Sequence, residues 1–227
     1  MHIIRNHAEA DKLGPFDFDR AEKGTFLEIW NDVFMQYNKT AEGTYEPLKQ
    51  RNVDTGMGLE RTLCILNGVE SVYETDIFEK AIAKIEELTG RKYGESEEVT
   101  KAFRVVLDHV RTATFMLGDD HGIVPSNTDQ GYILRRVIRR AVRYGRNIGL
   151  PKGALNEVSK TIIEKYASVY GELTRNAAHI AEELNKEEEK FSATLKQGIR
   201  EFEKVASALS AGGMIDGHSA FRLYDTY

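Results

Sequence analysis

The chain has 227 residues, with a hydrophobic content of 41%, a charged content of 30% and a net charge of −5. This composition predicts a soluble globular protein of one domain or two small ones, and the negative charge favours neither a general nucleic-acid binder nor a membrane-surface protein. The single cysteine, Cys64, excludes an internal disulfide and a thiolate-rich zinc site. No segment has the length of a signal peptide core or a membrane span. We therefore expect a cytoplasmic protein without a membrane partner.

Residues 26–66 are predicted to form a β-hairpin that leads into a helix. The segment FLEIWNDVFMQYN (26–38) is rich in aromatic and β-branched residues, as strands are. A turn at TAEGTYEP follows, and LKQRNVDTG forms a second extended segment before a helix that begins near Leu59. Residues 1–24 are polar and weakly patterned.

From about Thr75 onward the apolar residues recur at helical spacing. The segments DIFEKAIAKIEELTG and KAFRVVLDHVRTATFML predict two helices that stop at Gly90 and Gly118, a third helix is predicted over 132–146, and longer helices over about 155–209. The last helix carries a narrow apolar seam for packing against neighbours, made of Leu184, Phe191, Leu195, Ile199, Phe202 and Leu209. The run Glu187-Glu188-Glu189 is expected to form a solvated face. The sequence thus predicts a β-rich part up to residue 72 and a larger helical part over 73–227.

The junction DTGMGLER places two glycines, an acid and an arginine where the second strand meets its helix. Glycines allow a close approach of backbone to ligand, and the first amides of a helix point outward as an anion site. Arg61 could donate to a phosphate there. The pattern is neither G-x-G-x-x-G nor a P-loop. A strained structural turn, with Asp54 as its cap, and a phosphate contact explain it equally well.

Asn31 is the polar member of a strand face that is otherwise apolar. In LEIWNDVF, alternation places it with Leu27, Ile29 and Val33. A polar group on a buried face needs a partner, which is either the protein or a ligand. The pattern leaves both explanations open.

Six arginines and no acid lie in the twelve residues from 135 to 146. At about 100° per residue they occupy one contiguous arc of a helix. They are Arg135, Arg136, Arg139, Arg140, Arg143 and Arg146. Solvated helix faces usually mix charges of both signs, so this stripe indicates a polyanion partner; pairing with acids on neighbouring helices is the alternative. In the preceding loop, Asn127 could cap the helix or present its amide to a ligand.

Five segments, in order, resemble the alanyl-tRNA synthetases, a family of class II aminoacyl-tRNA synthetases. They are EIWNDVFMQYN, VDTGMGLER, DHVRTATFMLGDDHGIVPSN, GYILRRVIRRAVRYG and AFRLYDTY, and they span most of the chain from Leu27 to Tyr227. The resemblance implies an α+β fold in which the C-terminal part of a class II catalytic core, with its antiparallel sheet, occupies residues 1–72. A mainly helical tRNA-recognition domain then follows over 73–227.

The resemblance also implies ligands for the first part of the chain, namely ATP, Mg²⁺ and alanine. GMGLER is similar to the family's motif 3, in which the arginine, here Arg61, acts catalytically by holding the phosphate tail of ATP. Gly58 and, more weakly, Glu28 are implied to lie in the ATP and magnesium neighbourhood. The implied alanine pocket consists of Asn31, Asp54, which would receive the ammonium group, and Gly56, which would line the side-chain pocket. The histidines lack helical zinc-site spacing, and no zinc site is expected.

For the helical part, the resemblance implies recognition of the tRNA acceptor stem. The asparagine of PSN, Asn127, and the aspartate of LYDTY, Asp225, are implied to address the G·U wobble pair, through the wide minor groove of an A-form stem. The arginines would contact phosphates, which positions the RNA without specifying its sequence. These arginines are Arg135, Arg136, Arg139, Arg140 and Arg143.

Two family motifs are not found, namely motif 1 and the motif 2 that contains the ATP-gripping arginine, and the first twenty residues do not resemble the family. We expect the function of an alanine–tRNA ligase, with an isolated chain that does not form alanyl adenylate by itself. A non-catalytic acceptor-stem binding module is the alternative, and a regulatory protein that lost both ligands is a third interpretation. Apolar strand faces are expected to be uncovered unless the chain associates with the missing synthetase parts.

Overall fold

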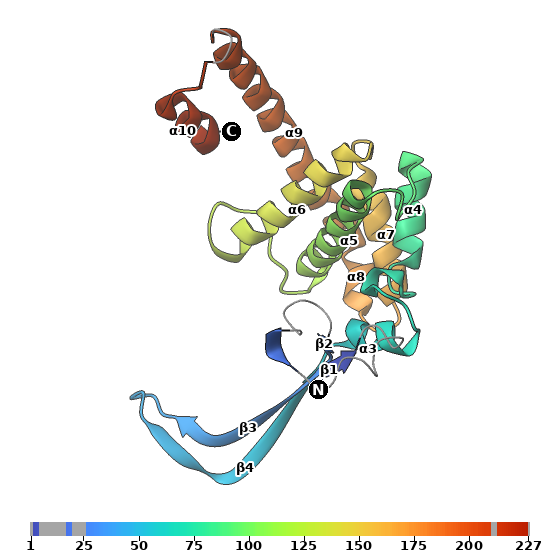
Figure 1. Cartoon of the computed structure of the whole chain (residues 1–227), viewed down its shortest axis with the longest axis vertical. Helices are drawn as coiled ribbons and strands as arrows, with labels where there is room; N and C mark the ends of the chain where they lie inside the picture. Colours follow the sequence, from blue (N-terminus) through green and yellow to red (C-terminus); the bar gives the residue numbers. More distant parts are fainter. Residues whose placement is uncertain (1, 5–16, 20–25, 210–212, 227) are drawn as a thin grey trace. The chain divides into compact units, whose positions relative to one another are not determined.

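The computed structural model describes residues 2–4, 17–19, 26–209 and 213–226 (Figure 1). The chain divides into two compact units, Met1–Glu79 and Lys80–Tyr227. All the described strands belong to the first unit, and the described elements of the second are helices. The α+β fold with a mainly helical larger part is therefore confirmed. The sequence placed the boundary after residue 72, and the assignment of the two parts to synthetase domains stays a prediction.

The described part of the first unit consists of two antiparallel strand pairs and a helix. The elements are β1 (His2–Ile4), β2 (Phe26–Glu28), β3 (Trp30–Lys39), β4 (Tyr45–Met57), α3 (Leu59–Leu66) and the 3₁₀ turn η2 (Val72–Glu74). Strand β1, which the sequence did not predict, pairs with β2, and β3 pairs with β4. The predicted hairpin and the helix after it are confirmed.

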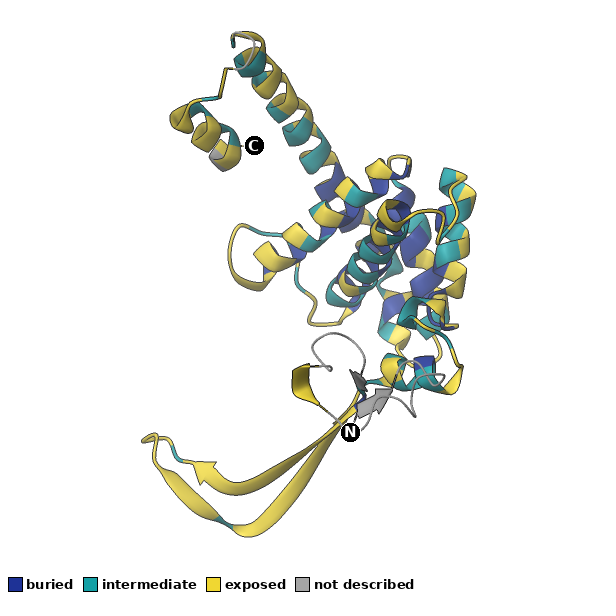
Figure 2. Ribbon diagram, in the orientation of Figure 1, coloured by how far each residue is buried: buried dark blue, intermediate teal, exposed yellow. Residues whose placement is uncertain are grey.

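Both faces of the β3–β4 hairpin are exposed along nearly its whole length (Figure 2). Asn31 and Val33 are exposed, so the expectation of a buried face around Asn31 is wrong for them, whereas Ile29 on the same face is buried and Leu27 lies outside the described side chains. A two-stranded ribbon has no second layer to cover either face, and its apolar side chains remain in water. Among these are Trp30, Val33, Phe34, Tyr37 and Val53. The expectation of uncovered apolar strand faces is confirmed.

The second unit is a helical assembly in which α5 takes the central place. Its helices are α4 (Glu79–Thr89), α5 (Glu97–Gly118), α6 (Asp129–Asn147), α7 (Ala154–Tyr166), α8 (Gly171–Arg175), α9 (Ala177–Ser207) and α10 (Gly217–Thr226). The predicted stops are confirmed: α5 ends at Gly118, and α4 ends before Gly90, whose φ of 69° is the left-handed conformation that glycine adopts readily.

The core of this unit forms where α5 packs against α6, α7, α8 and α9. Helix α5 buries an apolar stripe that includes Phe103 and Leu107, both 0% exposed. The buried Thr114 of this stripe is satisfied: its hydroxyl donates to the carbonyl of Val110 at 2.7 Å and is hydrogen-bonded to the hydroxyl of Ser159 on α7 at 2.8 Å. The helix positions in this unit therefore follow from close packing around one helix.

The apolar seam predicted on α9 is buried in the first half of the helix only. Ile180 and Leu184 are 1% exposed, but no residue from Phe191 to the end of the helix is buried, and Phe202 is 50% exposed. Helix α9 also contacts α10, and in its second half Glu201 lies 3.9 Å from Arg222 of that helix. Periodicity identified the apolar face but not how far its neighbours extend along it.

The packing between α5 and α6 predicts that substitutions at two adjacent residues of α6 change the free energy of unfolding by very different amounts. Leu134 is 0% exposed and Ile133 is 57% exposed. Leu134→Ala should lower the free energy of unfolding by about 2–5 kcal/mol, because it leaves a cavity in a packed core. Ile133→Ala should change it by less than about 0.5 kcal/mol. Urea unfolding followed by circular dichroism measures both, and equal losses would contradict the described orientation of α6.

Candidate functional site

The three residues implied for an alanine pocket lie on one face of the hairpin. Asn31 is the direct cross-strand partner of Gly56, and Val33 is the partner of Asp54. Because side chains alternate between the faces of a strand, cross-strand partners and residues two positions apart share a face. Asn31, Asp54 and Gly56 therefore share one. A Cβ atom on Gly56 would meet nothing within 4 Å, so packing among the described residues does not explain the glycine.

The strand-to-helix junction is not a strained turn, so that interpretation is wrong. Gly56 lies inside β4, and Gly58, the N-cap of α3, has φ −76° and ψ 108°, which any residue can adopt. Asp54 does not cap the helix, since its Oδ1 accepts a hydrogen bond of 2.9 Å from the amide of Thr55 and α3 has no side-chain cap. A Cβ on Gly58 would lie 3.3 Å from Cδ of Arg61, so the glycine leaves room for the arginine.

Arg61 is exposed and is anchored to the backbone of a strand segment 33 residues earlier in the chain. Its Nη1 donates a hydrogen bond of 2.9 Å to the carbonyl oxygen of Glu28, at the end of β2. A guanidinium group has five N–H donors, so this bond fixes its direction and leaves donors for an anion. The arrangement fits a phosphate. No group of three His, Cys, Asp or Glu side chains suited to a metal ion occurs in the described part of the chain.

Asn127 lies in the loop before α6 and is exposed. Its Oδ1 accepts a hydrogen bond from Nη1 of Arg135, and the side chain is exposed. Asn127 is not the helix cap, because the N-cap is Thr128. The bond from Arg135 occupies the Oδ1 acceptor, so the NH₂ donors of this exposed side chain remain for another partner. Of the two roles considered for this residue, the structure is consistent with presentation to a ligand.

Gly131 lets this loop lie directly against the first turn of α6. A Cβ atom there would be 2.3 Å from Oγ of Ser126 and 2.6 Å from the carbonyl oxygen of Val124. Ser126 closes the loop, since its amide donates to the carbonyl of Gly131 at 3.1 Å and its hydroxyl donates to the carbonyl of Thr128 at 2.8 Å. The position of Asn127 therefore depends on a glycine that the sequence interpretation did not single out.

The arginine stripe of α6 divides into two rows with different surroundings. The inner row faces α9: Nε of Arg139 lies 2.6 Å from Oε1 of Glu187, Nε of Arg135 lies 3.4 Å from the same oxygen, and Arg146 donates to Oγ of Ser192. The side chains of Arg135 and Arg139 are 22% and 27% exposed. The alternative of arginines paired with acids on a neighbouring helix thus holds for these two.

The outer row, Arg136, Arg140 and Arg143, is exposed. No carboxylate of the described residues lies within ion-pair distance of these three side chains. Two tyrosines of the same helix support them instead: the guanidinium carbon of Arg136 lies 5.8 Å from the ring centre of Tyr132, and that of Arg140 lies 5.6 Å from that of Tyr144. The outer row is therefore held in place and remains available to an anion.

The expectation that Glu187, Glu188 and Glu189 form a solvated face is wrong for two of the three. Glu187 is 2% exposed and Glu188 is 5% exposed, whereas Glu189 is exposed and pairs with Lys152 at 2.9 Å. Glu188 accepts a hydrogen bond of 3.1 Å from the amide of Gly153, yet burial raises the pKa of its carboxyl. The sequence contained a signal: positions 187 and 188 lie between Leu184 and Phe191, where the helical seam continues.

Asp225 is the remaining site residue that the sequence predicted, and His109 is one that it did not. Asp225 lies within α10, and its side chain is outside the part of the chain that the structure describes. His109 of α5, which the sequence interpretation passed over, lines a pocket with Arg136 and Arg140. Its position among buried residues, between Val106 and Val110, was the available signal.

Comparison with known proteins identifies the family. The model of the class II (A) tRNA synthetases matches residues 6–227, and the chain belongs to this family. The match begins at residue 6, so the expectation that the first twenty residues do not resemble the family is wrong for residues 6–20. No helix among the described residues is long and apolar enough to cross a membrane.

The similar proteins narrow the relationship to the alanine enzymes. The chain is 47% identical over 204 residues to an alanine–tRNA ligase of Borrelia hermsii, a match that covers 90% of this chain and 34% of that protein. It is 48% identical to an alanine–tRNA ligase of Treponema pallidum, with 90% and 34% covered, and 43% identical to one of Thermotoga maritima, with 90% and 23% covered. The chain thus spans a third or less of the length of these relatives and is homologous to one section of them.

The buried position of Glu187 predicts a loss of stability when its charge is removed. Glu187→Gln should lower the free energy of unfolding by about 2–4 kcal/mol, because two arginines lose the carboxylate that neutralises them; their partial exposure keeps the cost below that of a fully buried pair. Glu189→Gln is the matched control and should change it by less than about 0.5 kcal/mol. Urea unfolding at pH 7 compares them, and equal effects would contradict a structural role for Glu187.

Removing the charge of Glu188 is predicted to raise the free energy of unfolding, by an amount that depends on pH. Because its folded pKa is raised, the charged carboxylate costs stability above that pKa, and the cost disappears where the carboxyl is protonated in both the folded and unfolded states. Glu188→Gln can still accept the bond from Gly153. The variant should therefore be more stable than the wild type at pH 7.5, and the gain should vanish near pH 4. A gain that grows on acidification, measured by urea unfolding at both pH values, would disprove this.

Proposed function

We propose that the chain is the acceptor-stem-reading section of an alanine–tRNA ligase, together with part of its ATP and alanine site. The intact enzyme would activate alanine with ATP and transfer it to the 3′ end of its tRNA. The observation that carries the proposal is that Arg135 holds the carbonyl oxygen of the exposed Asn127, while the same helix carries three exposed arginines for which the described residues supply no acidic partner. A cytoplasmic location is part of this proposal.

For the RNA contact, we assign different tasks to the two arginine rows. Arg136, Arg140 and Arg143 would meet phosphates directly, because they are exposed and no acid among the described residues neutralises them. Arg135 and Arg139 would act at the same interface by holding Asn127 and by fixing α6 to α9. Asn127 and Asp225 would read the G·U pair in the wide minor groove of the stem, where an amide and a carboxylate meet base donors and acceptors. Phosphate contacts supply affinity and base contacts supply specificity.

For the first unit, the shared face of Asn31, Asp54 and Gly56 would hold alanine. The carboxylate of Asp54 would receive the ammonium group, and the missing side chain of Gly56 would leave room for the substrate methyl group. Arg61 would hold the phosphates of ATP, next to Gly58, with Glu28 near the magnesium ion. When bound, ATP and Mg²⁺ supply the activated phosphate and its charge neutralisation. The uncovered hairpin supports association with other synthetase parts, and a non-catalytic stem-binding module remains the second candidate.

The central test is binding of the 227-residue chain to an alanine acceptor-stem hairpin, with G·U compared with G·C at the wobble position. The hairpin with G·U should bind about 10-fold more tightly, since one good base contact is worth about 1–3 kcal/mol. Asn127→Ala should remove most of this difference and leave the dependence on salt concentration unchanged, because it takes away a base contact and no phosphate contact. Fluorescence anisotropy over a salt series measures both.

Two results of this experiment would decide against parts of the proposal. Equal affinity for the two hairpins, with a steep salt dependence, would leave phosphate binding and remove G·U recognition. No binding to either hairpin at low salt would remove the RNA function of the second unit. Asn185→Ala, on the exposed surface of α9, is the matched control and should change neither affinity.

The exposed hairpin predicts that the isolated chain does not form alanyl adenylate at a useful rate. Asn31, Asp54 and Arg61 are all exposed, and catalysis of this kind depends on positioned groups in a site from which water is excluded. Alanine-dependent pyrophosphate exchange should be at least about 10³-fold slower than with an intact synthetase measured in parallel. Turnover within tenfold of the intact enzyme would show that these residues suffice.

A further inference from the structure

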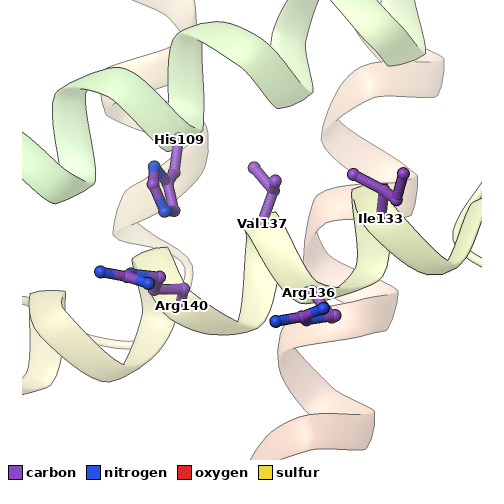
Figure 3. Close-up of a pocket in the computed structure, with 5 residues that line it drawn as sticks. All are labelled: His109, Ile133, Arg136, Val137 and Arg140. Atoms are coloured by element: carbon purple, nitrogen blue, oxygen red, sulfur yellow. The ribbon is translucent and has the colours of Figure 1, made fainter. Parts of the chain in front are cut away.

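A shallow pocket opens between α5 and α6 within the second unit (Figure 3). Its lining consists of His109 from α5 and Ile133, Arg136, Val137 and Arg140 from α6. His109 projects from α5 toward Arg140, Val137 lies beside it, and Ile133 lies farther along α6. The volume is about 180 Å³. A water molecule takes about 30 Å³, so the pocket can hold a group of several heavy atoms.

The charged side chains that line this pocket are of one sign. Arg136 and Arg140 are four residues apart on α6 and therefore lie on the same side of that helix. Neither has an acidic partner among the described residues, and each guanidinium group is supported by a tyrosine ring instead. Asp108, next to His109 on α5, lies 3.8 Å from Arg111. The pocket thus offers donors and no competing carboxylate in its lining.

We propose that this pocket binds one backbone phosphate of an RNA strand, with His109 as a third contact beside Arg136 and Arg140. The two guanidinium groups and the imidazole would donate to the phosphate oxygens, while the aliphatic side chains of Ile133 and Val137 would lie against the attached ribose. The inference rests on the function proposed above, since it assigns one phosphate contact of the same RNA-binding unit. It adds a residue from α5 to an interface otherwise built on α6.

His109 couples this contact to pH. Burial and the nearby charge of Arg140 lower the pKa of its imidazole, whereas Asp108 raises it more weakly, so the ring is neutral at pH 7 in the free protein. A phosphate in the pocket would bring a negative charge against the ring and raise its pKa. Binding would then take up a proton, and affinity would rise as the pH falls through the pKa of His109 in the complex. Arginine contacts alone give no such dependence, because arginine stays charged.

The test measures binding of the 227-residue chain to an acceptor-stem hairpin at pH 6 and pH 8, over a salt series. The wild type should bind about three- to tenfold more tightly at pH 6, and His109→Gln should abolish that ratio. Arg140→Gln should reduce the slope of log affinity against log salt by about one. The matched controls are His179→Gln on α9 and Lys160→Gln on α7, both exposed, and each should behave as the wild type.

The outcomes separate this inference from the proposed function. Hairpin binding by the wild type, with His109→Gln and Arg140→Gln equal to their controls, overturns the pocket alone. No hairpin binding by the wild type overturns the RNA function itself. As a readout that needs no variant, an NMR titration should show the pKa of His109 rising when the hairpin is added. A rise with inorganic phosphate but not with the hairpin would identify a site for free phosphate and overturn the assignment to RNA.

Discussion

The ion pair between Arg139 of α6 and the buried Glu187 of α9 decides which way the basic helix faces. Six arginines in one arc cannot all turn toward a packed core, since each buried charge needs a partner. One carboxylate, 2% exposed, lies within 4 Å of Nε of both Arg135 and Arg139 and thereby settles the inner edge of the arc. The outer arginines are then directed to solvent. In this way a structural interaction creates the surface on which the proposed function depends.

The same interaction is linked to the loop that carries Asn127, the residue proposed to read a base pair, through a short chain of contacts. Arg135 lies between Glu187 and Asn127, and it donates to the carbonyl oxygen of the asparagine. The loop itself approaches α6 closely because Gly131 has no side chain. Affinity and specificity would thus be assigned to different residues of one helix and its leading loop. The first unit is arranged differently: the residues proposed to hold alanine lie on an exposed ribbon, and we expect a partner to be needed before they act in catalysis.

The sequence predicted the elements well and their surroundings less well. The hairpin, the helix after it and the helices of the second unit follow from local periodicity and from glycine stops such as Gly90, which act over a few residues. The exposure of Asn31 and the burial of Glu187 and Glu188 depend on which other segments are close in space. A single sequence does not contain that information, although the continuing seam around position 187 was a partial signal. The pocket at His109 was missed for the same reason, since its lining joins two helices.

The most direct test of this account compares two double variants of α6 in the same RNA-binding and unfolding experiments. Arg135→Gln/Arg139→Gln removes the inner charges, and Arg140→Gln/Arg143→Gln removes two of the outer ones. The account predicts that the inner pair lowers the free energy of unfolding by about 2 kcal/mol or more and leaves the salt slope of hairpin binding nearly unchanged. The outer pair should reduce the slope by about two and leave stability unchanged. Equal effects of the two pairs on both quantities would show that the arginines act as one undivided stripe, and would contradict the account.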